Sequence, residues 1–427
     1  MPAAASPPGS TAPDRARDVV ELRASERAAI VEHARTWFPE VLPDDGSGFG
    51  GLRLLDHVAA DPWYRRSVAG ARTFSSSGTS GQPKQIAWTS AEDDWYVGEK
   101  QDLLAQWLDG SQRGFISLAV GHNAGSAHLV FERLGMTVHD AGLSNLTDQH
   151  DTVVEFAPDV VYCSPTILDR LVTTLAGTRS IPPVRRVITN GEVLYPALRR
   201  RVQDCFDLPD DAIIDTYGST EIGTIAASCP RCLRYHFLAD IYPEVVDAAE
   251  LPTDVRAAGP GRVALAVSSL KRTSFPIIRF FTYDVIEGLG RTTCGGLERF
   301  TFDRIVGRCD DVVNYGELFS TYELADLIRG ALPGAGWFVF SARNDLTVVI
   351  EGVEPSGFRD ELAARYPLHA EMVALGLLPP PDLRFVERFG EFAARAGLPP
   401  GPVGKDVRRI VPTGLDERWL DDLVPAR

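Results

Sequence analysis

Short apolar runs alternate with longer amphipathic segments through the middle of the chain. The runs at 115–120 and 160–163 are compact and apolar, as buried strands are. The segments 122–134 and 165–175 that follow them space their apolar residues as helices do. Strands that alternate with helices of this length favour a largely parallel, doubly wound sheet, which binds ligands at the carboxyl ends of its strands. The fold class that we predict is therefore α/β.

Strands and helices continue to alternate on both sides of this region, and near residue 261 the pattern changes to successive strands. Further helices are predicted at 19–37, 90–108, 148–156 and 195–205, and further strands at 136–138, 184–189 and 212–215. Val-, Ile- and Phe-rich strands then follow at 263–267, 277–281 and 299–306. The last region combines helices at 322–328 and 355–366 with strands at 336–341 and 346–351.

These patterns divide the chain into three parts. Residues 1–18 are rich in Ala, Pro, Ser and Gly and predict a disordered tail. Residues 19–308 predict a large domain with a doubly wound αβ part and a β-rich subdomain. Residues 309–427, which follow a charged break, predict a small α+β domain.

The amino-acid composition and net charge argue against some classes of binding partner. The chain is 44% hydrophobic and 24% charged, as ordinary globular proteins are. Its net charge of −15 argues against nucleic acid or an anionic membrane as a partner, because both require a basic surface. The N-terminus does not resemble a signal peptide and no apolar run is long enough to span a membrane, so we expect a cytoplasmic protein.

The stretch 74–89, FSSSGTSGQPKQIAWT, is the strongest chemical signal in the sequence. Gly78 and Gly81 let the main chain approach a ligand, and successive backbone N–H groups of such a turn form a concavity for anions. Lys84 supplies a positive charge. A flexible linker is the alternative, but strand-like segments flank the loop on both sides, which favours a phosphate-binding loop. It is not a Walker loop, because no Lys-Ser/Thr pair closes it.

Other stretches supply what a nucleotide site needs. In 216–221, TYGSTE, the aromatic ring can stack on a base, the threonine can bond a phosphate and the carboxylate can hold Mg²⁺. Asp284 follows a buried strand, where a carboxylate suits ribose hydroxyls, although it can equally begin a turn. Arg308 lies on a charged break between domains, where it can reach a ligand, and Lys405 lies on a Gly/Pro loop. The alternative for both is an ordinary solvated side chain.

In their order along the chain, these stretches resemble the adenylate-forming superfamily of acyl-CoA ligases, adenylation domains and luciferases. The residues at 132–135, 163–166 and 276–284 are similar to the phenylacetate-CoA ligase branch, and the resemblance covers about 72–410. It implies an ATP-dependent ligase that converts an aromatic carboxylate to an acyl-adenylate, releases pyrophosphate and passes the acyl group to CoA. Charge builds on the phosphoryl oxygens during adenylation, which Mg²⁺ and a lysine stabilise.

The resemblance assigns a role to each matching residue. The ATP phosphates would contact Ser75, Ser76, Ser77, Gly78, Thr79, Ser80, Gly81 and Lys84. The nucleoside would lie against Gly191, Glu192, Tyr217, Gly218, Ser219, Asp284 and Arg308, with the last two on the ribose. Thr220 would touch the α-phosphate, Glu221 would hold Mg²⁺, and Lys405 matches the lysine that enters the site for adenylation. Asp310 would be the hinge of a mobile C-terminal domain, because Lys405 must leave before the acceptor enters.

Cys229, Cys232, His236 and Cys294 form a further candidate site, for structural zinc. Three sulfurs and one imidazole complete a closed tetrahedral shell, and some members of the branch look similar here. Ordinary buried cysteines beside an unrelated histidine are the alternative. Six cysteines in a chain of this size do not indicate a disulfide framework.

Two departures from the branch bear on the substrates. The segment 120–128 is small and polar where the branch has its acyl-pocket residues, so His122 and Asn123 are pocket candidates and a hydroxy- or amino-substituted aromatic acid is favoured over phenylacetate. Glu317 lies where thiolation takes place, which weakens the inference of CoA. Amide formation, or activation of nitrite to diazotise an aromatic amine in antibiotic or other specialised metabolism, are the alternatives.

Two further alternatives concern the chain as a whole. A non-catalytic nucleotide-binding protein on the same fold would carry many of the same stretches. A homodimer is one assembly open to such a chain, and no residue pattern decides it.

Overall fold

A computed structural model of the chain describes residues 21–75, 84–118, 122–142, 146–178, 181–247, 249–251, 261–309, 312–315, 317–342, 345–391 and 409–410. The tail at 1–18, most of the phosphate loop, Asp310 and Lys405 lie outside these ranges, and so does the side chain of Glu317.

The largest sheet has nine strands in the order β13-β14-β9-β8-β7-β6-β5-β3-β4. Its parallel strands are β3 (Arg113–Ser117), β4 (Thr137–Asp140), β5 (Val160–Cys163), β6 (Arg186–Asn190) and β7 (Ile213–Ser219). The antiparallel extension is β8 (Gly223–Ser228), β9 (Tyr235–Phe237), β13 (Gly290–Cys294) and β14 (Leu297–Phe302). Parallel pairing therefore stops at β7, where the sheet changes direction.

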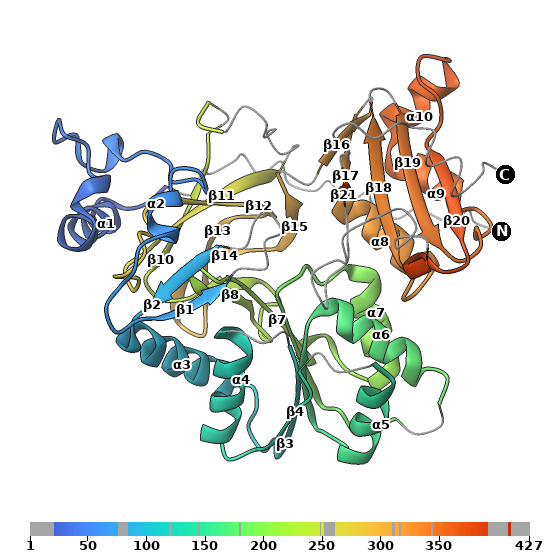
Figure 1. The fold of residues 1–427 in the computed structure, drawn as a ribbon, viewed down its shortest axis with the longest axis horizontal. Helices are drawn as coiled ribbons and strands as arrows, with labels where there is room; N and C mark the ends of the chain where they lie inside the picture. The colour runs from blue at the N-terminus through green and yellow to red at the C-terminus, as the bar shows by residue number, and fades with distance from the viewer. Residues whose placement is uncertain are drawn as a thin grey trace, which may run out of the picture.

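Helices cover both faces of the parallel strands, as Figure 1 shows. They are α3 (Ser90–Ala105) and α4 (His122–Arg133) on one face, and α5 (Leu146–Phe156), α6 (Pro165–Leu175) and α7 (Pro196–Phe206) on the other. The side chains of successive residues in each strand point to opposite faces of the sheet. The row Ile116–Tyr162–Ile188–Ile214 packs with α3 and α4, and the row Phe115–Val161–Val187–Ile213 packs with α5 to α7. The predicted doubly wound α/β fold is confirmed.

The β-rich part contains a second sheet of four antiparallel strands. These are β10 (Ile241–Val245), β11 (Arg262–Ser269), β12 (Phe280–Glu287) and β15 (Arg304–Arg308), and a β1 (Arg72–Ser75) and β2 (Gln85–Trp88) hairpin forms a small sheet of its own. Helices α1 (Ala24–Trp37) and α2 (Asp61–Tyr64) share a buried core with these strands. Short 3₁₀ segments lie at Pro39–Val41, Gly48–Gly51 and Asp210–Ala212.

The C-terminal elements form the part at the upper right of Figure 1. They are β16 (Val312–Tyr315), β17 (Glu317–Ser320), α8 (Thr321–Ala331), β18 (Trp337–Ala342), β19 (Asp345–Glu351), α9 (Phe358–Arg365), α10 (Pro367–Ala374), β20 (Asp382–Val386) and β21 (Arg409–Ile410). Four of the strands form a sheet in the order β20-β19-β18-β21. Helix α8 joins this part to the rest, because Asp326 accepts a 2.9 Å hydrogen bond from the Ala197 amide and Arg329 pairs with Asp169. The boundary at residue 309 stays a prediction.

The structure corrects several predicted elements. Strand β12 begins later than predicted and continues to Glu287, so Asp284 lies inside a strand and not at its end. Pairing with β15 extends it, since Asp284 stands opposite Arg308. The predicted strand at 299–306 is two strands in different sheets, β14 and β15. The helix predicted at 355–366 is α9, and α10, which follows it, was not predicted.

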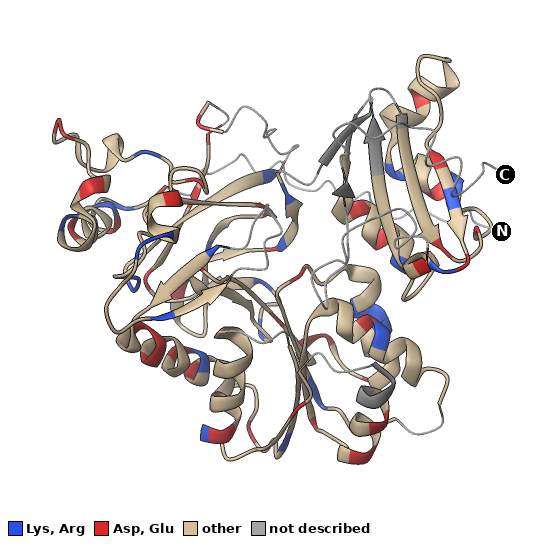
Figure 2. Ribbon diagram, in the orientation of Figure 1, with Lys and Arg blue, Asp and Glu red and all other residues tan. Residues whose placement is uncertain are grey.

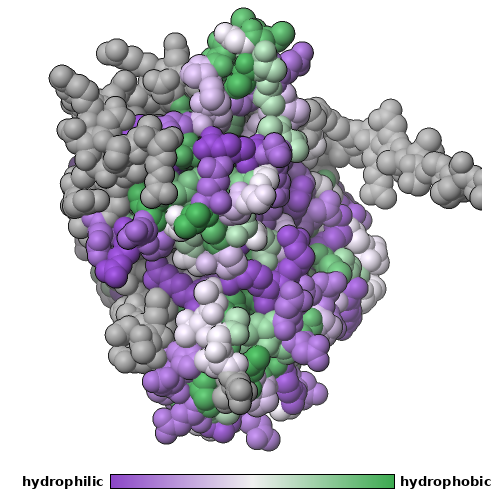
Figure 3. All heavy atoms as spheres, turned by 90° about the vertical axis from the view of Figure 1, so that its right-hand side faces the viewer, coloured by the Kyte–Doolittle hydropathy of each residue, from purple (hydrophilic) through white to green (hydrophobic). Residues whose placement is uncertain are grey.

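Charge is spread over the molecule. Acidic and basic residues are interspersed on the described ribbon in Figure 2, and the face in Figure 3 mixes hydrophilic with hydrophobic residues. Within the part of the chain that the structure describes, no helix is both long enough and apolar enough to cross a bilayer.

A buried ion pair connects the separate layers beside the β1–β2 hairpin. Arg272 and Glu92 are 0% and 2% exposed, and their Nη1 and Oε2 atoms lie 2.7 Å apart. Glu92 also accepts hydrogen bonds from the backbone amides of Thr89, Thr273 and Ser274 at 2.6–2.8 Å, so it caps α3 and fixes the segment after β11. Burial lowers the pKa of Arg272 to about 10, although Glu92 opposes the shift.

Arg272 donates from its other nitrogens to two backbone carbonyls. Nη2 donates to Ala87 on β2 at 2.7 Å and Nε donates to Glu221 at 2.8 Å. The guanidinium also stacks 3.8 Å above the Trp88 ring. One side chain therefore positions β2, α3 and the turn after β7.

We predict that Arg272→Met lowers the free energy of unfolding by about 3–5 kcal/mol, because it leaves the buried Glu92 carboxylate without its cation. Chemical denaturation monitored by tryptophan fluorescence measures the change. The matched control is Arg65→Met, since Arg65 forms an i,i+4 pair with Asp61 in which the side chains are 76% and 50% exposed. The control should change stability by less than about 1 kcal/mol. Equal effects of the two substitutions would contradict the role of the buried pair.

Candidate active site

The turn after β7 lies where the sheet changes from parallel to antiparallel pairing, and it carries the predicted 216–221 motif. Tyr217 and Gly218 flank a register shift between β7 and β8. A Cβ atom at Gly218 would lie 2.3 Å from the carbonyl oxygen of Gly223, so only glycine allows the two strands to approach. Ser219 follows with a buried hydroxyl that has no hydrogen-bond partner among the described residues.

Three residues predicted to bind the nucleoside meet at the edge of this turn. The Tyr217 hydroxyl donates to Asp284 Oδ2 at 2.5 Å, and Arg308 Nη1 lies 3.4 Å from Asp284 Oδ1. Burial and the negative charge of Asp284 raise the pKa of Tyr217 well above its usual value. The three side chains come from β7, β12 and β15, and the opposed register of Asp284 and Arg308 brings the last two together.

Glu221 and Lys84 both lie close to Tyr64, a residue that sequence reasoning did not identify. Tyr64 donates to Glu221 Oε1 at 3.3 Å, while Lys84 Nζ lies 5.0 Å from the centre of the Tyr64 ring. The Tyr64 hydroxyl also contacts His57 Nδ1 at 3.0 Å, and the His57 ring stacks on Tyr283. This chain of contacts links the predicted magnesium carboxylate to the residue next to Asp284.

The backbone around the remaining predicted residues is also fixed. Trp88 Nε1 donates to the Thr220 carbonyl at 3.0 Å. Ser75 stands opposite Gln85 in the β1–β2 hairpin and accepts a 2.7 Å hydrogen bond from its side chain, so both ends of the phosphate loop are held. The loop residues Ser76, Ser77, Gly78, Thr79, Ser80 and Gly81 lie outside the described ranges, as do Asp310 and Lys405.

Gly191 and Glu192 follow the end of β6, next to the same strand edge. Gly191 has φ of 87°, a conformation that favours glycine. Glu192 accepts a 2.5 Å hydrogen bond from the Thr166 hydroxyl on α6. Both residues therefore have fixed positions beside the carboxyl ends of β5 and β6.

His122 lies at the start of α4 in an aromatic enclosure. Its ring centroid is 4.1–4.5 Å from those of Phe74, Trp88 and Tyr96. Nε2 contacts Asp93 Oδ1 at 2.7 Å, and Asp93 also pairs with Arg72 at 2.9 Å. Burial lowers the pKa of His122 to about 4 despite the carboxylate, so the imidazole is neutral at pH 7.

Asn123, the second predicted pocket residue, belongs to a hydrogen-bonded network at the strand ends. Its Nδ2 donates to Asn190 Oδ1 at 2.8 Å, and its Oδ1 accepts from Tyr162 and Lys100 at 3.2 and 2.6 Å. Sequence reasoning missed Lys100, because a lysine in a helix usually faces solvent. A cavity of about 290 Å³ opens beside this network, between β1, α3, α4 and β4, and its lining includes Arg72, Phe74, Asp93, His122 and Ser126.

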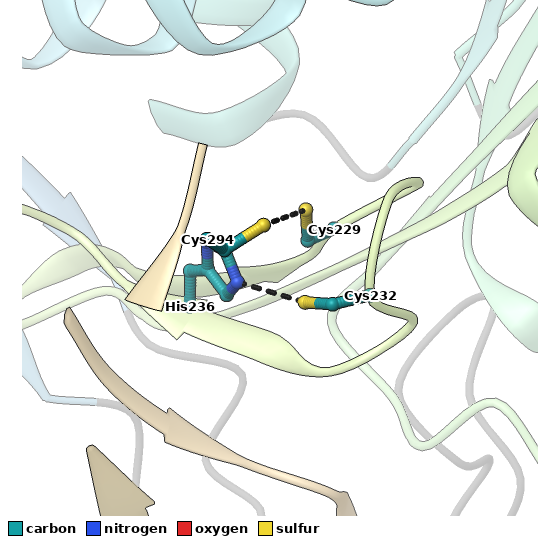
Figure 4. A group of neighbouring side chains, drawn as sticks. All are labelled: Cys229, Cys232, His236 and Cys294. Atoms are coloured by element: carbon teal, nitrogen blue, oxygen red, sulfur yellow. Dashed lines mark hydrogen bonds between the residues drawn. The ribbon is translucent and has the colours of Figure 1, made fainter. Parts of the chain in front are cut away.

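The four predicted zinc ligands converge on one point, as Figure 4 shows. The ligand atoms of Cys229, Cys232, His236 and Cys294 all lie within 4.8 Å of one another. Cys229 Sγ and Cys294 Sγ are 3.9 Å apart, which excludes a disulfide between them and is close to the edge of about 3.8 Å that zinc–sulfur bonds of ~2.3 Å give in a tetrahedron. Residues from two separate hairpins supply this donor set, so it is not a chance feature of one turn.

The thiol of Cys229 lies in a setting that favours thiolate. Burial would raise its pKa, but hydrogen bonds from the backbone amides of Cys232 and Arg231 and from neighbouring thiols lower it overall. Cys163, Cys205 and Cys309 lie outside this cluster.

The chain is similar to known AMP-binding enzymes and ligases. Residues 74–259 match the family of AMP-binding enzymes. The chain is 28% identical over 362 residues to fumarate–(S)-2,3-diaminopropanoate ligase of Enterobacter agglomerans, covering 80% of this chain and 89% of that protein. It is 27% identical over 303 residues to phenylacetate-coenzyme A ligase of Escherichia coli (strain K12), covering 64% and 65% of the two chains.

Among solved structures, a 2-hydroxyisobutyryl-CoA ligase in complex with an acyl-adenylate has a similar fold. The TM-score is 0.65 at 16% identity, and the match covers 93% of this chain and 88% of the other.

Proposed function

Because this chain belongs to the adenylate-forming superfamily and is an ATP-dependent, AMP-forming ligase, we propose that it activates a small polar carboxylic acid and transfers the acyl group to an amine. The observation that carries the adenylation step is the meeting of Tyr217, Asp284 and Arg308 beside Glu221, at the edge where the sheet changes direction. Such an edge is where open α/β sheets bind nucleotides.

The nucleoside would lie against the Tyr217 ring with its ribose on Asp284 and Arg308. The Tyr217–Asp284 hydrogen bond fixes the carboxylate, and Arg308 holds its other oxygen, so the ribose hydroxyls meet an oriented acceptor and a cation. The phosphates would extend toward Thr220 and the loop that ends at Lys84. Preorganised groups of this kind stabilise charge that develops at the α-phosphate without reorganising during the reaction.

Glu221 suits a magnesium ion. It is a mostly buried carboxylate with one oxygen fixed by Tyr64, and Mg²⁺ in nucleotide sites takes one or two carboxylates together with substrate phosphates. When bound, the ion would neutralise phosphate charge while the substrate carboxylate attacks the α-phosphorus. The new P–O bond forms as the bond to pyrophosphate breaks, which leaves the acid as a mixed anhydride with AMP.

An amine is the acceptor that we favour over CoA. The relative from Enterobacter agglomerans, which by its name joins an acid to an amino acid, matches over most of both chains. The segment 120–128 is also small and polar where the branch has its acyl-pocket residues, which favours a small polar acid. Attack of the amine nitrogen on the acyl carbon breaks the anhydride, gives an amide and releases AMP. Transfer to CoA is the second candidate, because the phenylacetate-coenzyme A ligases are also relatives.

The C-terminal residues complete the proposal. Lys405 would contact the reacting phosphate during adenylation, and rotation about Asp310 would remove it before the acceptor enters. Glu317 would then lie near the acceptor. A structural zinc ion held by Cys229, Cys232, His236 and Cys294 would cross-link the hairpins of the antiparallel extension, because three thiolates and one imidazole form a closed shell.

We expect acid-dependent exchange of pyrophosphate into ATP. The screen contains small polar acids, dicarboxylic acids, aromatic acids and nitrite, and mass analysis of reactions with amines or with CoA identifies the product. The expected product has the mass of acid plus amine minus water. A thioester with CoA alone would refute amide formation, and binding of ATP without any exchange would indicate a non-catalytic nucleotide-binding protein.

We predict that Lys405→Ala slows acyl-adenylate formation on the order of 100-fold, as loss of a single charge-stabilising group does in other enzymes. Transfer from a chemically prepared acyl-adenylate to the acceptor should change little. Lys271→Ala is the control, since Lys271 pairs with Asp240 at the surface. Full adenylation by the Lys405 variant would remove the assigned role.

The cysteine cluster predicts near-stoichiometric zinc in purified protein, measured by elemental analysis. Replacing Cys229 and Cys232 together by serine should abolish metal binding and lower the thermal midpoint, because the cross-link between the hairpins is lost. Cys205→Ser, outside the cluster, should retain the metal. Metal-free wild-type protein that stays empty when supplied with Zn²⁺ would disprove the site.

A further inference from the structure

Lys100 is a buried cation, and no carboxylate among the described residues pairs with it. The chain has four lysines, Lys84, Lys100, Lys271 and Lys405, and Lys100 is only 2% exposed, on the face of α3 that covers the sheet. Its ammonium donates to Asn123 Oδ1 at 2.6 Å, Ser126 Oγ at 3.0 Å and the Asn123 carbonyl at 3.2 Å. Among the described residues, no carboxylate oxygen lies within 4.0 Å of it.

These contacts satisfy the hydrogen bonds of Lys100 but not its charge. The rings of Tyr96 and Tyr162 lie 5.5 and 5.1 Å from Nζ and offer cation–π attraction, which replaces only part of the lost hydration. Burial accordingly lowers the pKa of Lys100 to about 7. A carboxylate brought next to this ammonium would replace one of the three neutral acceptors and supply the counter-charge that they lack.

Arg272 shows how the same protein treats a cation that is purely structural. Its guanidinium is equally buried, but Glu92 lies 2.7 Å away and backbone carbonyls take its remaining donors. The acceptors of the Lys100 ammonium are all neutral, namely an amide oxygen, a hydroxyl and a backbone carbonyl. Among the described residues the chain supplies no counter-ion for Lys100, and we infer that a ligand supplies it.

The surroundings of Lys100 lead directly to the nucleotide site. Asn123 donates to Asn190 at 2.8 Å, and Asn190 donates to the Thr216 hydroxyl at 2.9 Å. Thr216 precedes Tyr217 on β7. Asn123 and Asn190 are only half-buried, and Ser126, which accepts from Lys100, lines the cavity of about 290 Å³. Asp93 lines the same cavity, where Arg72 and His122 contact its carboxylate.

We propose that the acid activated by this ligase carries a second anionic group, as a short dicarboxylic acid does, and that Lys100, Asn123 and Ser126 form the subsite for it. The inference rests on the proposed function, in which the first carboxylate attacks ATP. The second carboxylate would accept from the Lys100 ammonium and complete the missing ion pair. An acid with a neutral distal end would leave the buried charge unpaired, which gives the pocket its selectivity.

The test compares fumarate and succinate with their monomethyl esters, using acid-dependent pyrophosphate exchange. Wild-type enzyme should favour the dicarboxylates by about 100-fold in kcat/KM, because one buried ion pair distinguishes the two sets. Lys100→Met should lose most of this preference, because kcat/KM should fall far more for the dicarboxylates, through a higher KM, than for the monoesters. The control Lys271→Met should keep the wild-type preference.

Two other outcomes would overturn the inference. Wild-type enzyme that accepts monoesters or aromatic monocarboxylates as well as dicarboxylates has no such subsite. If Lys100→Met lowers kcat/KM equally for both sets, Lys100 only cross-links α3 and α4. Lys100→Arg, which keeps the charge, must retain a preference for dicarboxylates if the methionine variant fails to fold. Absence of exchange with every acid would refute the proposed function itself, whereas exchange with monocarboxylates alone would refute only the subsite.

Discussion

The buried contact between Arg272 and Glu92 is the constraint on which the arrangement of the site depends. One carboxylate caps α3 and holds the segment after β11, while one guanidinium holds β2 and the carbonyl of Glu221. The pair therefore fixes the β1–β2 hairpin relative to the turn after β7. A buried pair of this kind is costly to break, which makes it suited to holding several layers in one relative position.

The two buried cations Arg272 and Lys100 differ in their surroundings, and we assign a structural role to the first and a ligand-binding role to the second. Arg272 has an internal anion and needs no ligand, whereas Lys100 is surrounded by neutral oxygens and aromatic rings. The networks around the two cations approach one another at the end of β7, where Thr216 belongs to one and Glu221 to the other. Activation of an acid by ATP requires its carboxylate and the nucleotide to meet at one place, and we propose that this place is the strand edge after β7.

Sequence reasoning selected more of the residues that meet on the proposed nucleotide side of the site than on the proposed acyl side. Tyr217, Asp284 and Arg308 lie in short stretches whose residue types suit a nucleotide, and the structure brings them together from three strands. Tyr64, Arg272 and Lys100 could not be found in this way, because their roles come from long-range packing and not from local pattern. The alternation of apolar runs likewise predicted the doubly wound sheet, while the length of β12 depended on its pairing with β15.

The central claim is that a carboxylate of the substrate attacks the α-phosphorus of ATP. Oxygen-18 transfer tests it most directly: a dicarboxylic acid labelled in its carboxylates is incubated with the enzyme, ATP and an amine acceptor, and the nucleotide product is analysed by mass spectrometry. The account predicts AMP that carries one labelled oxygen, together with unlabelled pyrophosphate, because the anhydride oxygen stays with phosphorus when the acyl group leaves. ADP with labelled inorganic phosphate, or AMP without label, would contradict it.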